Sequence, residues 1–103
     1  MTGIAYAQAG GDAAERAQIN AIVQWTDAHD AEGMALLERA VNMNSGTGNH
    51  AGVRAVGALF RAEFDALGFT TRWVDGAAFG RAGHLVAEHP GPGPKILLIG
   101  HLD

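Results

Sequence analysis

A solid apolar run, residues 95–100 (KILLIG), limits most strongly what this chain can fold into. Turn residues flank the run, and the rigid segment PGPGP at residues 90–94 precedes it. Short apolar runs without alternating polar residues are typical of strands that are buried on both faces of an α/β sheet. The sequence therefore predicts an α/β fold in which this run is an inner strand.

Three segments before this run have the apolar spacing of helices. The first spans residues 12–25, with Asp12 as its N-cap. The second begins at residue 30 or 31 and ends at Met43. The third spans residues 50–67, where Asn49 can cap the start and Gly68 the end.

Two further segments predict strands. Residues 69–74 are rich in β-branched and aromatic side chains, and residues 84–88 form a shorter apolar stretch. The expected order is three helices followed by three strands. Because a parallel sheet needs a crossover connection after a buried central strand, we expect the chain to be the N-terminal fragment of a longer protein.

Composition excludes several classes of function. The 103 residues correspond to one small domain. With 7 Lys+Arg against 11 Asp+Glu, the formal charge is −4, which disfavours a nucleic-acid partner. No cysteine is present for a disulfide or a thiolate–zinc site. No apolar run approaches the ~20 residues of a membrane span, so we expect no membrane partner.

Residues 1–11 form a lead of small, uncharged residues before the domain at residues 12–103. The lead contains the pattern A-x-A twice, as in signal-peptide cleavage sites, but no basic region or apolar core precedes it. It is either a disordered lead or the remnant of a signal peptide. The pattern favours export, to the periplasm for example, without excluding the cytoplasm.

His101 and Asp103 are the candidate functional residues. Side chains two positions apart in a strand point to the same side. The carboxyl end of a buried strand is where ligands bind in open α/β sheets. A metal-bound histidine needs its second ring nitrogen held, often by a carboxylate. The alternative is a surface histidine that lies beside a surface aspartate at the start of a loop.

Four segments in order resemble the N-terminal part of a zinc metallopeptidase family. That family includes glutamate carboxypeptidase, acetylornithine deacetylase and succinyl-diaminopimelate desuccinylase. The segments are LLERAVNMNSGTGN (residues 36–49), FRAEFDALGF (60–69), GHLVA (83–87) and KILLIGHLD (95–103). The resemblance spans residues 30–103 and implies a phosphorylase/hydrolase-like mixed sheet with helices packed on it.

By this resemblance, His101 is a ligand to one Zn²⁺ of a two-zinc site and Asp103 is the catalytic-site residue that supports it. The family's other ligands and its general base lie downstream. The resemblance implies that the parent enzyme cleaves a peptide or an N-acyl amino acid, with a homodimer formed through a domain outside this chain. We expect the isolated chain to bind zinc weakly and to be inactive.

Two other interpretations remain open: a small α/β binding or interaction module without metal chemistry, and an aggregation-prone truncation product. The remaining histidines are interpreted as structural or solvated. The glycine-containing segment at residues 44–49 is interpreted as a plain turn, because it lacks the lysine and the preceding strand of a phosphate-binding loop.

Overall fold

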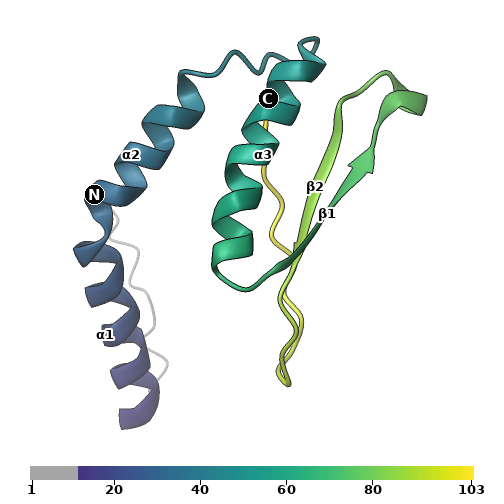
Figure 1. Cartoon of the computed structure of the whole chain (residues 1–103). Helices are drawn as coiled ribbons and strands as arrows, with labels where there is room; N and C mark the ends of the chain where they lie inside the picture. The colour runs from purple at the N-terminus through teal and green to yellow at the C-terminus, as the bar shows by residue number, and fades with distance from the viewer. Residues whose placement is uncertain (1–11) are drawn as a thin grey trace, which may run out of the picture. The chain divides into compact units, whose positions relative to one another are not determined.

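The computed structural model describes residues 12–103, so the prediction of a lead or signal-peptide remnant at residues 1–11 lies outside the described residues. The chain divides into two compact units: the first ends at Leu36 and the second spans Leu37–Asp103. Each unit is described by itself. The elements are α1 (Ala13–Ala28), α2 (Asp30–Val41), α3 (His50–Ala66), β1 (Thr70–Asp75), the 3₁₀ turn η1 (Ala77–Phe79) and β2 (Gly83–Glu88) (Figure 1). No helix within residues 12–103 has the length and apolar character needed to cross a membrane.

Helix α1 begins where the sequence predicts. The carboxylate of Asp12 accepts a hydrogen bond from the backbone N–H of Glu15 at 2.8 Å, which confirms the N-cap. The helix ends three residues later than expected. At that end the Thr26 hydroxyl donates to the Val23 carbonyl at 2.8 Å, and the ring of His29 stacks on Trp25.

Helix α3 is the longest element of the second unit and also has the predicted cap. The side chain of Asn49 accepts a hydrogen bond from the Gly52 N–H at 3.1 Å. The helix is followed by Gly68, whose φ of 83° lies in the left-handed region that glycine adopts without strain. Both ends of α3 are therefore set by local chemistry that can be read from the sequence.

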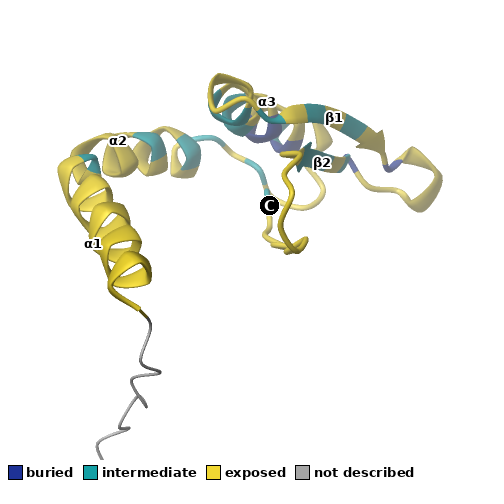
Figure 2. Ribbon diagram, turned by 90° about the horizontal axis from the view of Figure 1, so that it is seen from below, coloured by how far each residue is buried: buried dark blue, intermediate teal, exposed yellow. Residues whose placement is uncertain are grey.

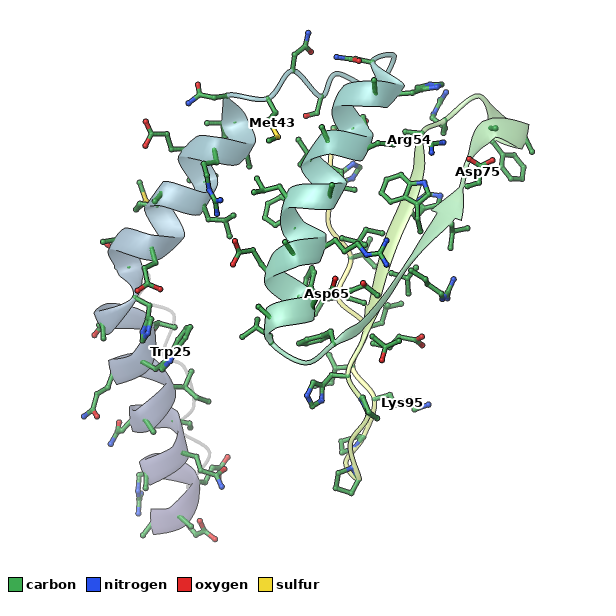
Figure 3. All side chains as sticks on the ribbon, viewed as in Figure 1. Trp25, Met43, Arg54, Asp65, Asp75 and Lys95 are labelled. Atoms are coloured by element: carbon green, nitrogen blue, oxygen red, sulfur yellow. The ribbon has the colours of Figure 1, made fainter. Side chains whose placement is uncertain are left out.

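Strands β1 and β2 form an antiparallel hairpin in which Thr70 pairs with Glu88 and Asp75 pairs with Gly83. These two predicted strands are confirmed: both ends of β1 lie one residue later than expected, and β2 begins one residue earlier and ends where expected. The Trp73 indole N–H donates to the Ala82 carbonyl at 3.2 Å. Figure 3 labels Arg54 and Asp75, which form an exposed ion pair at 2.9 Å between α3 and the end of β1.

The core of the second unit lies between α3 and the hairpin. Its buried apolar side chains are Val53, Val56 and Ala82 (Figure 2). Gly57 is also buried, and a Cβ added there would lie 2.6 Å from Cζ3 of Trp73. The absence of a side chain at Gly57 therefore lets the indole of β1 approach the helix backbone closely.

The prediction of a third strand at residues 95–100 is wrong for this structure. The segment is irregular, and Ile96 to Ile99 are 82–88% exposed. A strand requires hydrogen-bonded pairing with a neighbour, and β1 and β2 pair only with each other in the sheet formed by residues 12–103. The observed fold is a small α/β arrangement of three helices and a two-stranded antiparallel sheet.

Candidate functional site

The structure brings the two predicted site residues together. Nδ1 of His101 lies 3.1 Å from Oδ1 of Asp103. An ionised carboxylate can only accept hydrogen bonds, so Nδ1 carries the proton and donates it. The other ring nitrogen, Nε2, then keeps its lone pair, and the His101 side chain is 87% exposed. This arrangement is the one in which a histidine can bind a metal ion through Nε2.

A third side chain, that of Thr47, completes the site. Its hydroxyl donates to Oδ2 of Asp103 at 2.7 Å, across 56 positions of sequence. The two oxygens of the carboxylate therefore have different partners, the threonine and the histidine. From its sequence, the segment around Thr47 is interpreted as a plain turn. Its contact with Asp103 is not predicted, although the segment carries part of the family resemblance.

The pKa of Asp103 is lowered from its ordinary value. The hydrogen bond from the Thr47 hydroxyl is the largest cause, and the hydrogen bond from His101 is the second. Both partners donate to the ionised form and so favour it. The carboxylate therefore stays charged further into the acid range than an unpartnered aspartate.

The turn that carries Thr47 is fixed by two asparagines. The side chain of Asn49 donates to the Asn44 carbonyl at 2.7 Å, and the Asn49 backbone N–H donates to the Gly46 carbonyl at 2.6 Å. Because Asn49 also caps α3, the turn is attached to the start of that helix. A Cβ added at Gly52 would lie 1.8 Å from the Asn44 carbonyl oxygen, so the close approach requires glycine there.

We expect Gly52→Ala to destabilise the chain by about 1–3 kcal/mol, the usual cost of forcing a group into occupied space. The matched control is Gly48→Ala in the same turn, where an added Cβ meets no atom within 4 Å and should change stability by less than about 0.5 kcal/mol. Urea unfolding of both variants measures the difference. Equal stabilities would contradict the packing of the turn on α3.

A hollow of about 380 Å³ adjoins the site within the second unit. The end of α2, the turn, one face of α3 and residues 101–103 surround it. Its lining is mainly apolar, with polar groups contributed by the site, and consists of Leu37, Ala40, Val41, Met43, Ser45, Val56, Phe60, His101, Leu102 and Asp103. Figure 1 shows the last residues of the chain returning alongside α3, which places the site on this helix.

The other histidines have contact partners other than His101 and Asp103. Nδ1 of His29 donates to the Trp25 carbonyl at 2.7 Å at the end of α1. His50 is the first residue of α3, and His84 lies in β2. The ring of His89 packs edge-on against Phe69, with centroids 5.0 Å apart. These positions agree with the structural or solvated roles expected for them.

The residues of the site fit one ligand position of a zinc centre and not a whole centre. An imidazole whose Nδ1 is held by a carboxylate is the usual donor to zinc. A catalytic zinc takes about three protein ligands. Residues 12–103 contain no cluster of three or more His, Cys, Asp or Glu side chains that could surround an ion.

The chain therefore has a small α/β fold and a histidine–aspartate pair in which the histidine is a candidate metal ligand. By sequence it is a distant partial homologue of a metallopeptidase. The relative is carboxypeptidase G2 from Pseudomonas sp. (strain RS-16), 37% identical over 68 residues. The match covers 65% of this chain and 16% of the relative. No family model and no solved structure matches the chain.

Proposed function

We propose that this chain supplies the first metal-binding segment of a two-zinc metallohydrolase that cleaves a peptide or N-acyl amide bond. The reaction class is that of a glutamate carboxypeptidase-like exopeptidase. One observation carries the proposal: His101 is held at Nδ1 by Asp103 and leaves Nε2 exposed, in a chain that is partly homologous to carboxypeptidase G2.

In this proposal each residue has a separate role. His101 binds one zinc ion through Nε2, and Asp103 fixes the tautomer and the orientation of the ring. When bound, a pair of zinc ions supplies such a site with a water of lowered pKa and a polarised substrate carbonyl. The match covers 16% of the relative. The remaining ligands and the general base would come from the part of the parent protein that corresponds to the unmatched remainder of the relative.

The same proposal accounts for the exposed run at residues 96–99. In a mixed sheet with helices packed on it, these side chains would be covered and the backbone would pair with neighbouring strands. In this structure they are open to solvent. An exposed apolar segment with unpaired backbone is an aggregation liability, so additional chain at this face would stabilise the domain.

The test is to purify the gene product from the source cells and to measure its intact mass, its zinc content and its hydrolysis of amides. We expect a mass several times 10.7 kDa and about two zinc ions per chain. We also expect release of the C-terminal amino acid from a peptide, or of the free amino acid from an N-acyl amino acid. A natural protein of 10.7 kDa without zinc would contradict the proposal and would favour a small binding or interaction module.

A further inference from the structure

The side chain of Asp103 is held from two directions. Its hydrogen bonds to other side chains within residues 12–103 come from His101, two positions away, and from Thr47 in the turn before α3. The His101 contact is local and moves with the same segment. The Thr47 contact is the one that ties this carboxylate to the body of the fold.

The need for such a tie follows from the backbone around the site. Residues 95–103 are irregular, and within residues 12–103 they pair with no strand that would fix their orientation. The turn that carries Thr47 is, in contrast, bonded through Asn49 to the first turn of α3. The Thr47 hydroxyl is therefore attached to α3 and can set the rotation of the Asp103 carboxylate, whose own backbone is irregular.

We propose that Thr47 is a positioning residue. By holding Oδ2 of Asp103, it turns Oδ1 toward Nδ1 of His101, and the lone pair of Nε2 is then free to bind a metal ion. This inference rests on the proposed function for its consequence in metal binding. The positioning itself can be measured in the metal-free chain, so the two ideas can fail separately.

The first experiment is nitrogen NMR of the metal-free 103-residue chain at about pH 8, above the ordinary titration range of histidine side chains. Thr47→Val removes the hydroxyl and keeps the shape, whereas Thr47→Ser keeps the hydroxyl. We expect the ratio of the Nδ1–H to the Nε2–H form of His101 to fall about fivefold in Thr47→Val. Thr47→Ser and the control Thr70→Val, on the exposed first position of β1, should retain the ratio.

An unchanged ratio in a folded Thr47→Val chain overturns the inference. The amide spectrum reports folding, and Thr47→Ala replaces Thr47→Val in the comparison if the valine disturbs the turn. A fall in the ratio in Thr47→Ser equal to that in Thr47→Val also overturns it, because the hydroxyl would then have no part in the effect.

The second experiment measures zinc affinity in the gene product by competition with a chelator. We expect about tenfold weaker binding in Thr47→Val and wild-type affinity in Thr47→Ser, as for other groups that support a ligand. Wild-type affinity in Thr47→Val overturns the role in metal binding. A protein that shows the tautomer change but never binds zinc at His101 supports the positioning contact and overturns the proposed function.

Discussion

From the proposed function we expect His101→Ala in the gene product to remove zinc from one position and to lower kcat/KM for amide hydrolysis by at least about 10³-fold. Among residues 12–103, His101 is the histidine whose Nδ1 bonds to a carboxylate, that of Asp103, and its side chain is 87% exposed. A catalytic metal supplies several kcal/mol of transition-state stabilisation, and each 1.36 kcal/mol corresponds to about tenfold in rate. Metal analysis and steady-state kinetics on the same preparation measure both effects.

The matched control is His50→Ala, which removes an exposed histidine from the first position of α3. It should leave zinc content and turnover unchanged. Asp103→Asn should lower zinc affinity about 10- to 100-fold while the protein stays folded. The amide keeps the size of the side chain but has one acceptor oxygen, so it cannot present separate acceptor oxygens to Thr47 and to Nδ1 of His101. Full zinc content and wild-type turnover in His101→Ala would refute the assignment.

The local structure of the chain was predictable from sequence because it depends on short-range chemistry. Asp12 and Asn49 cap the helices that they were expected to cap, and Gly68 follows α3 with a positive φ. Strand β1 is rich in β-branched and aromatic residues, and β2 contains an apolar stretch. In each case the determining atoms lie within a few residues of one another.

The run at residues 95–100 shows where such prediction fails. Its composition indicates that the side chains belong in an apolar environment, but composition does not provide the partner strand. In the structure the run is exposed and irregular. A strand exists only with a neighbour, so this element depends on chain that the pattern itself cannot specify.

The candidate site was predictable only in its local part. His101 and Asp103 were paired on the assumption of strand alternation, and they meet at 3.1 Å although the backbone there is not a strand. A separation of two residues suffices for the contact. The contact with Thr47 spans 56 positions and depends on how the turn packs on α3, which no local pattern reports.

The isolated 103-residue chain should bind Zn²⁺ no more tightly than about millimolar and should hydrolyse no amide. A dissociation constant of about 1 mM corresponds to about 4 kcal/mol, whereas complete structural zinc sites in peptides reach about 10–16 kcal/mol. The described residues offer one imidazole that is held by a carboxylate, and no cluster of three ligands. Without that cluster, most of the free energy of a zinc site is missing.

Calorimetry of the isolated chain with Zn²⁺ measures this directly, and NMR locates the weak binding. Because His50, His84 and His89 are also exposed, zinc should perturb several histidines, and His101 differs from them in having a carboxylate at Nδ1. His101→Ala should therefore change the total heat little. Sub-micromolar, one-to-one binding that disappears in His101→Ala would mean that these 103 residues hold a complete site, and the need for further ligands would be refuted.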